Sequence, residues 1–432
     1  MTKATYSETI FNEKWVILAF LLGHMLSFLI TGMGASVSRI IFDAFFLWVL
    51  GVYLFHTVIS RKYLRGRFQI TSQCFVLVLL TATVIWRRYY QISVIRDFSI
   101  LVFYLFICIN GVKEQGKRLL DEIAFLLIIY SFIMSLISFV SIELNTPFIQ
   151  IVSDNRVRGY YSNSNIAGMY CVISAVMVWY WQRRKILLER IPYFRAFAVL
   201  NCAVQMLMLW KTKSRTALIA AMILLISWIL HSEKFQSMKQ RATQKYGKKY
   251  SIFAVLLVSG ILYFLLLTPY GLPRNIYYYM HEAFTSTDPK YSTWTGKLNY
   301  ITSNRMFLWE AAFQKIREFP IIGYGLNCIG KVFQLYESYD NTHNLLINTL
   351  LYSGVIGLGL LLYLLYLIFS GAKKSGNGTA YLFYYFLIAF FLAALLDKYI
   401  LYTDEIINAV FWIVSGYLMS QETYDSEESR EH

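Results

Sequence analysis

The chain has 432 residues, of which 57% are hydrophobic, 18% aromatic and only 15% charged. Because soluble domains carry roughly 25% charged residues, this composition excludes an ordinary soluble protein and predicts an integral membrane protein. The net charge of +15 does not indicate nucleic-acid binding. The basic residues of the chain form short clusters between apolar runs, as at residues 61–67. Membrane topology and anionic lipid headgroups account for these clusters. The expected partner is therefore the lipid bilayer and not nucleic acid.

Apolar runs recur along the chain at close to the length that a helix needs to cross a bilayer, about 20 residues. They predict an all-α, polytopic integral membrane protein with about 12 transmembrane helices. Several runs are short, notably the fourth, eighth and twelfth. In chain order the predicted helices are 15–31, 41–59, 70–86, 97–112, 122–142, 166–182, 193–210, 216–230, 252–268, 345–369, 381–396 and 406–419.

The distribution of Lys and Arg orients these helices. With a cytoplasmic N-terminus, the inner segments hold more than twice as many Lys and Arg as the short outer segments. This positive-inside bias places both termini in the cytoplasm. The first run is expected to be an uncleaved anchor and not a signal peptide, because more spans follow and no clear cleavage site is present. The chain then divides into nine helices (1–269), a large extracytoplasmic loop (270–344), three helices (345–420) and an acidic cytoplasmic tail (421–432).

The cysteines predict neither a disulfide framework nor a cysteine-based metal site. Cys74, Cys108, Cys171 and Cys202 fall within apolar runs, and Cys328 lies in the loop with no obvious partner. The sequence also contains no Asp-x-Asp and no cluster of outer carboxylates at metal-ligand spacing. We therefore expect no metal and no other cofactor.

The long polar loop contains a predicted amphipathic helix at residues 303–319. Ser303 or Asn304 can cap it, and Pro320 stops it. An element of this kind is expected on or near the membrane interface. Its apolar residues recur at helical spacing, at Trp309, Ala312, Phe313, Ile316 and Phe319.

Cations on the outer side are informative because membrane topology depletes them there. Several lie near helix ends, where a long side chain can reach the headgroups, so snorkelling is one interpretation. The other is a diphosphate site, because a guanidinium group can bind phosphate with two parallel hydrogen bonds. The cations are Arg87, Arg88, Arg96, Arg156, Arg158, Lys211, Lys213, Arg215, Arg274 and Arg305.

Three local patterns each allow two interpretations. Lys211, Lys213 and Arg215 lie in a tight outer hairpin, which calls for an anionic partner, either a carboxylate or a bound phosphate. Asn163 and Asn165 can cap the sixth helix, while the two arginines before it favour an anion site. His343 can cap the tenth helix or act as a general base.

Taken together and in order, these motifs resemble the O-antigen ligase/polymerase superfamily, which includes Wzy-type polymerases and WaaL-type ligases. The resemblance covers residues 156–357. The motifs are Arg158-Gly-Tyr with Asn163 and Asn165, Lys-Ser-Arg215-Thr-Ala-Leu, Asn304-Arg305 with Trp309, Pro320-Ile-Ile-Gly323-Tyr-Gly325, and His343-Asn344 with Gly354.

The resemblance implies an enzyme of the bacterial cytoplasmic membrane that transfers a glycan from an undecaprenyl-diphosphate carrier to a sugar hydroxyl at the outer leaflet, with inversion. By motif, Arg215 and Arg305 would bind the diphosphate and His343 would activate the acceptor hydroxyl. A flippase and a chain-length regulator are the protein partners that it implies. The substrate-binding residues would be Arg158, Arg156, Arg88, Asn165, Lys213 and Asn344.

Three functions remain open at this stage. A repeat-unit polymerase for capsule, exopolysaccharide or O-antigen is favoured over a ligase, which uses the same donor and a different acceptor. A lipid-linked oligosaccharide flippase belongs to another class, and it is disfavoured because the two halves of the chain show no internal repeat. The acidic residues Asp397, Asp404 and Glu405 are interpreted as part of the last outer turn.

Overall fold

A computed structural model describes most of the chain. The described residues are 11–26, 35–86, 93–143, 151–152, 156–159, 161, 163–184, 193–231, 237, 276–289, 292–302, 305–326, 328, 342–374, 378–397, 399–402 and 406–428. Nearly all of them are helical, and the strands among them are one antiparallel pair of two residues each.

The elements follow the apolar runs of the sequence. In chain order they are α2 (Glu13–Met25), α4 (Ala35–Leu54), a π-helical turn (Phe55–Ile59), a 3-10 turn (Lys62–Leu64), α5 (Arg67–Ile85), α6 (Ser93–Val102), a second π-helical segment (Phe103–Cys108), α7 (Ile109–Glu143), β1 (Ile151–Val152), β2 (Arg156–Val157), α8 (Ser164–Gln182), α10 (Phe194–Thr212), α11 (Arg215–His231), α14 (Ile276–Thr285), α15 (Trp294–Ile301), α16 (Arg305–Glu318), α18 (Leu345–Lys374), α19 (Gly378–Ala394) and α20 (Ile406–Glu428).

The predicted class, an all-α multi-pass membrane protein, is confirmed. Within the described ranges, five helices are long and apolar enough to cross a membrane, and three shorter apolar helices coincide with predicted spans 216–230, 381–396 and 406–419. The predicted spans 97–112 and 122–142 share one long helical segment, which breaks at Gly116, where φ is 59° and ψ is −140°. The ninth span, 252–268, lies outside the described residues, so the total of 12 stays a prediction.

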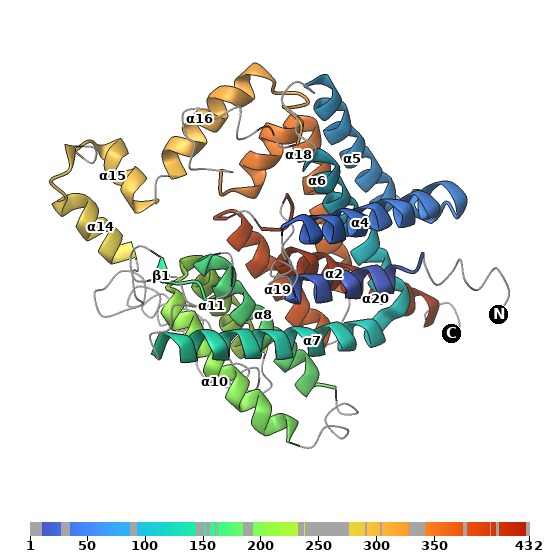
Figure 1. The fold of residues 1–432 in the computed structure, drawn as a ribbon, viewed down its shortest axis with the longest axis horizontal. Helices are drawn as coiled ribbons and strands as arrows, with labels where there is room; N and C mark the ends of the chain where they lie inside the picture. The colour runs from blue at the N-terminus through green and yellow to red at the C-terminus, as the bar shows by residue number, and fades with distance from the viewer. Residues whose placement is uncertain are drawn as a thin grey trace.

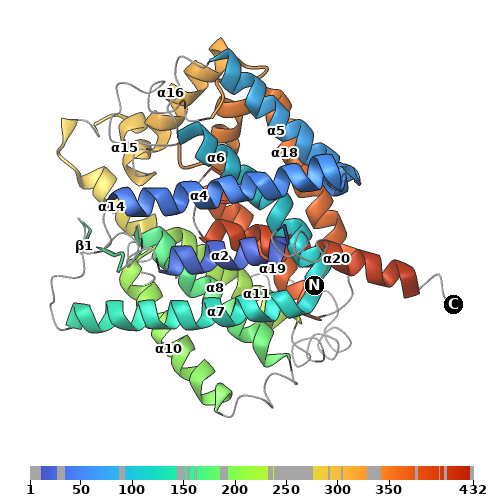
Figure 2. The ribbon, with the colours of Figure 1, turned by 45° about the vertical axis from the view of Figure 1, so that its right-hand side comes forward.

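The helices pack as a bundle with an arm along one side. In Figures 1 and 2, α2, α4 and α7 run side by side, and α8, α10 and α11 gather next to α7. α18 lies along α5, and α20 packs against α7. The arm consists of α14, α15 and α16, and it extends from beside β1 to α18 in both views.

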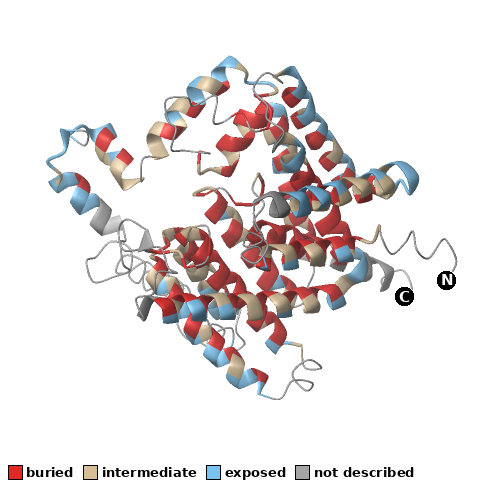
Figure 3. Cartoon of the chain, in the orientation of Figure 1, coloured by how far each residue is buried: buried red, intermediate tan, exposed pale blue. Residues whose placement is uncertain are grey.

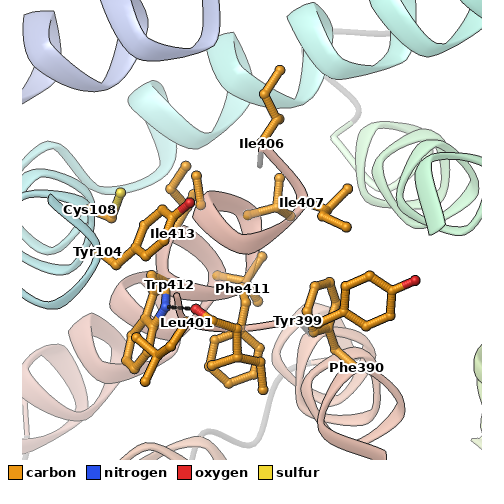
Figure 4. Packing of buried hydrophobic residues seen from close by; sticks show 14 of the residues in the cluster. Tyr104, Cys108, Phe390, Tyr399, Leu401, Ile406, Ile407, Phe411, Trp412 and Ile413 are labelled. Atoms are coloured by element: carbon orange, nitrogen blue, oxygen red, sulfur yellow. Dashed lines mark hydrogen bonds between the residues drawn. The ribbon is translucent and has the colours of Figure 1, made fainter. Parts of the chain in front are cut away.

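The interior is apolar and continuous from one part of the bundle to the next. Figure 3 shows buried residues concentrated where helices face one another and exposed residues on the outward faces of α4, α5, α10 and α14. The last helix is the most enclosed: Phe411 and Trp412 are fully buried. Figure 4 shows Phe411 between Trp412 and Phe390 of α19, and the Phe390 ring also contacts Tyr399 in the loop that follows.

The predicted loop helix exists as α16, and it ends just before Pro320. Its predicted caps, residues 303–304, lie outside the described residues. Ala312 and Ile316 of the predicted apolar face are buried, together with Leu308, whereas Phe313 is 45% exposed. α16 packs on α18, so its inward face meets protein.

The glycine pair after α16 docks onto a break in α18. Gly354 has φ 60° and ψ −164°, and this non-helical backbone exposes carbonyl and N–H groups in the middle of the helix. The following turn satisfies them: Tyr324 N–H donates to the Leu351 carbonyl (2.8 Å), and Val355 N–H donates to the Pro320 carbonyl (2.8 Å). Backbone groups away from water require such partners, so this pairing joins the loop to the bundle.

Neighbouring side chains support the same junction. The Trp86 ring lies 4.2 Å from the Phe319 ring and 5.5 Å from the Tyr324 ring, measured between centroids. Glu318 accepts hydrogen bonds from Lys315 and from the Tyr324 hydroxyl. Both bonds lower the pKa of the Glu318 carboxyl, and the bond from Lys315 has the larger effect.

We expect Gly354→Ala to lower the free energy of unfolding by about 1–3 kcal/mol, because an added Cβ would lie 2.2 Å from the Ile321 carbonyl oxygen at a positive φ. Thermal unfolding in detergent measures this. Gly359→Ala is the matched control in the same helix, since its Cβ would meet nothing within 4 Å. Equal stability of the two variants would contradict the docking role of Gly354.

Candidate functional site

A chain of hydrogen bonds connects four segments at one end of the bundle. His343 Nδ1 lies 3.1 Å from Asp397 Oδ1. Asn165 Nδ2 donates to the other carboxylate oxygen of Asp397 (2.7 Å), and Ser214 Oγ donates to Asn165 Oδ1 (3.0 Å). Ser214 immediately precedes Arg215 in the sequence. A continuous polar connection therefore runs from the residue beside Arg215 to the imidazole of His343.

Three of these segments are helix starts, and their caps hold them in place. Asn163 Oδ1 accepts from the Ile166 N–H and caps α8 (2.9 Å), as its position in the sequence predicts. Ser214 Oγ accepts from the Ala217 N–H and caps α11 (3.3 Å). Asn344 Oδ1 accepts from two N–H groups of α18. Each cap satisfies a donor that a helix leaves open at its N-terminus.

His343 is therefore not the cap of α18, because Asn344 performs that role. His343 has φ 51°, an uncommon conformation for a residue other than glycine, and its side chain is 28% exposed. The preceding residue, Thr342, is fixed on both sides: Trp309 Nε1 donates to its carbonyl (2.9 Å), and its own N–H and hydroxyl donate to Asn348. The imidazole is thus positioned by α16 and α18 together.

Asp397 is almost completely buried, with 3% of its side chain exposed. A buried carboxylate is costly unless it is paired and hydrogen-bonded. Asn165 and His343 contact one oxygen each, so the negative charge lies directly against the imidazole. A carboxylate in this position orients a histidine ring and selects which ring nitrogen carries the proton.

Arg215 and Arg305 each begin a helix, α11 and α16 respectively. Arg215 Nη1 donates to the carbonyl of Ile301, the last residue of α15 (3.3 Å). The backbone N–H of Arg305 donates to the carbonyl of Thr302, which follows Ile301. The loop segment that carries Arg305 is therefore attached at Arg215. The connection between Trp309 and Thr342 attaches the same loop beside His343.

The other predicted substrate-binding residues differ in position. Arg158 is half-buried in the turn after β2, and Lys213 ends α10 with φ 49°. Asn165 lies inside the hydrogen-bond chain. Arg156 lies in β2, but its side chain is not among those described, and Arg88 lies outside the described residues.

The electrostatics of this end of the bundle favour an anion. The N-termini of α8, α11 and α18 meet here through the hydrogen bonds above, and helix N-termini carry partial positive charge. Arg215 adds a full charge at one of them. A guanidinium group beside a helix N-terminus is a suitable environment for phosphate. Among the described residues, no group of three His, Cys, Asp or Glu side chains could hold a metal ion.

The predicted family resemblance is confirmed by comparison with known proteins. A family model described as O-antigen ligase matches residues 197–362, which include Arg215, Arg305 and His343. This match supports the resemblance to the O-antigen ligase/polymerase superfamily over those residues. No curated protein matches the chain.

Sequence reasoning missed two members of the site, Asp397 and Ser214. The sequence places Asp397 in the last outer turn, and only the structure brings it to His343, 54 residues earlier. Its position gives no local signal, because a charged residue is costly within a membrane span but not just beyond its end. The sequence does not single out Ser214, which lies between the cations of its hairpin, although serine before a predicted helix is a common cap.

We expect Asp397→Ala and Asn165→Ala to be non-additive, because Asn165 donates to the carboxylate that the first variant removes. A double-mutant cycle on thermal unfolding should give a coupling free energy of about 0.5–3 kcal/mol.

Asn201→Ala serves as the control for that cycle. Asn201 is a buried amide on another helix, bonded to Ser174 and Gln205. Ser174 lies nine residues beyond Asn165, about 14 Å along α8. Asn201→Ala and Asp397→Ala should therefore combine additively. Additivity in both cycles would show that Asn165 does not support Asp397.

Proposed function

We propose that the chain is a polysaccharide repeat-unit polymerase. It transfers a glycan from an undecaprenyl-diphosphate carrier to a sugar hydroxyl of a lipid-linked acceptor at the outer leaflet of the bacterial cytoplasmic membrane. Both termini lie in the cytoplasm in this proposal. The observation that carries it is the connection of the His343–Asp397 pair to Arg215 through Asn165 and Ser214.

His343 is the proposed general base. With its Nδ1 proton held by Asp397, Nε2 is the acceptor for the proton of the attacking hydroxyl. The hydroxyl oxygen forms a bond to the anomeric carbon as the bond from that carbon to the diphosphate oxygen breaks. Attack opposite the leaving group inverts the configuration. The Asp397 carboxylate stabilises the imidazolium that results.

Arg215 and Arg305 are the proposed partners of the leaving diphosphate. Negative charge increases on the diphosphate as the glycosidic bond breaks, and guanidinium groups fixed at helix starts stabilise it without reorganisation. Arg158 and Lys213 would add positive charge at the donor, as would Arg156 and Arg88. The arginines supply the electrostatic role that a metal ion performs in other phosphate chemistry, so the proposal requires no metal.

A ligase is the second candidate, supported by the description of the matching family model. It uses the same donor, so the same residues would act, and it differs only in placing the completed polymer on a terminal acceptor. The flippase differs more, since it moves the lipid-linked unit without breaking the glycosidic bond. A flippase and a chain-length regulator are proposed as partner proteins of the polymerase.

We expect Arg215→Ala, Arg305→Ala and His343→Ala each to reduce glycan transfer by at least about 10²-fold, because each removes charge stabilisation or proton transfer in the transition state. Arg→Lys at either position should restore little, since a lysine cannot form two parallel bonds to phosphate. Purified protein with lipid-linked donor and acceptor provides the assay.

Arg317→Ala is the matched control, because Arg317 is exposed in the last turn of α16, the helix that Arg305 begins. It should retain transfer at close to the wild-type rate. Wild-type rates from the three site variants as well would refute the assignment of these residues.

Deletion of the gene distinguishes the three functions through the lengths of the surface glycans. Single repeat units on the normal acceptor are the expected result and indicate a polymerase. Full-length polymer retained on its lipid carrier would instead indicate a ligase. Repeat units retained on the cytoplasmic face would indicate a flippase and would refute glycan transfer.

A further inference from the structure

The loop that carries Asp397 is buried and has unusual backbone geometry. It connects α19 to α20, and its residues Tyr399, Ile400 and Leu401 are at most 2% exposed. Ile400 has φ 83° and Tyr402 has φ 68°. Positive φ in a β-branched residue is a true outlier that costs about 1–3 kcal/mol. Such geometry persists only where the surroundings hold it.

Two side chains of α20 hold Ile400 by both of its backbone polar groups. Asn408 Oδ1 accepts from the Ile400 N–H (2.8 Å), and Trp412 Nε1 donates to the Ile400 carbonyl (2.7 Å). Asn408 and Trp412 are four residues apart and thus share one face of α20. Figure 4 shows the hydrogen bond from the Trp412 indole nitrogen beside Leu401, and Trp412 is fully buried. Neither residue belongs to the motifs that predict the site.

The fixed point lies three residues after Asp397. On the other side of Asp397, Asn344 Nδ2 donates to the Leu395 carbonyl (2.9 Å), which lies two residues before it. The carboxylate is therefore held between two anchored positions, one attached to α18 and one to α20. Tyr402 adds a third attachment through its hydroxyl, which donates to Thr349 Oγ1 (3.1 Å).

Because Ile400 lies three residues after Asp397, the bonds that hold Ile400 also affect the position of the Asp397 carboxylate. A bond of 3.1 Å between Asp397 and His343 is lost if the carboxylate moves by about 1 Å, and displacements of that size can reduce a rate by about 10²-fold. The positive φ at Ile400 shows that the loop would relax elsewhere without its two partners. Holding it in this conformation keeps the carboxylate against the imidazole.

We propose that Asn408 and Trp412 are positioning residues that act through Ile400 and Asp397 to orient His343. In its catalytic consequence this inference rests on the proposed glycan transfer. In its structural consequence it concerns only the contact between Asp397 and His343. The two consequences are measured separately.

The structural measurement uses the full-length protein labelled with ¹⁵N at its six histidines, with the His343 ring signals assigned by their absence in His343→Gln. Asp397→Asn should shift those signals. Asn408→Leu and Trp412→Phe should shift them in the same direction, because each removes one bond to Ile400 and leaves an apolar side chain in its place. Ser415→Ala is the control: Ser415 Oγ donates within α20, to the Phe411 carbonyl, and its loss should leave the signals unchanged.

The kinetic measurement uses the glycan-transfer assay. We expect Asn408→Leu and Trp412→Phe to lower kcat about 10- to 100-fold while KM for the donor changes less than about twofold. In an Asp397→Asn background neither substitution should lower kcat further by more than about twofold, since both act through that carboxylate. If either substitution lowers kcat in the Asp397→Asn background by the same factor as in the wild-type protein, the positioning role is overturned.

The two measurements separate the possible failures. Unshifted His343 signals in folded Asn408→Leu and Trp412→Phe refute the proposal, whatever reaction the protein performs. If Asn408→Leu does not fold, the milder Trp412→Phe decides. If the variants shift the His343 signals but the wild-type protein transfers no glycan, the positioning of His343 is supported and the proposed function is refuted.

Discussion

The need to satisfy every backbone polar group away from water is the constraint on which this architecture depends. An uninterrupted helix meets it internally, but this bundle is interrupted at Gly354 and again between α19 and α20. At each interruption a distant segment supplies the missing partners: the turn after α16 for the first, and Asn344, Asn408 and Trp412 for the second. The candidate site lies among these connections. Its geometry is therefore a consequence of how the breaks are satisfied.

Much of the helical framework could be predicted from the sequence, because hydropathy reports directly on the bilayer. Apolar runs such as 70–86 and 166–182 coincide with α5 and α8 within a few residues, and α16 ends where Pro320 stops it. Asn163 was a predictable cap because capping is local in sequence. Gly116 shows the limit of the method: the turn between two spans is a single non-helical residue, which hydropathy does not register.

The site itself could be predicted only in part. Arg215, Arg305 and His343 stand out as polar residues beside apolar runs, and each belongs to a motif. Their arrangement could not be predicted, because it depends on pairings across long sequence separations. Asp397 meets Asn165, 232 residues earlier, and nothing local to either residue indicates the other. The same holds for Asn344, whose side chain caps α18 and also holds the Leu395 carbonyl.

The separation of charges would let one site serve two opposite requirements of the proposed glycan transfer. A diphosphate requires positive charge, and a general base requires a nearby carboxylate, which would weaken that positive field. Asp397 is buried, and its two oxygens face Asn165 and His343, so its charge is directed at the imidazole. Asn165 and Ser214 stand between that carboxylate and the start of α11, where Arg215 lies. Neutral amide and hydroxyl groups thus join the two parts mechanically while keeping their charges apart.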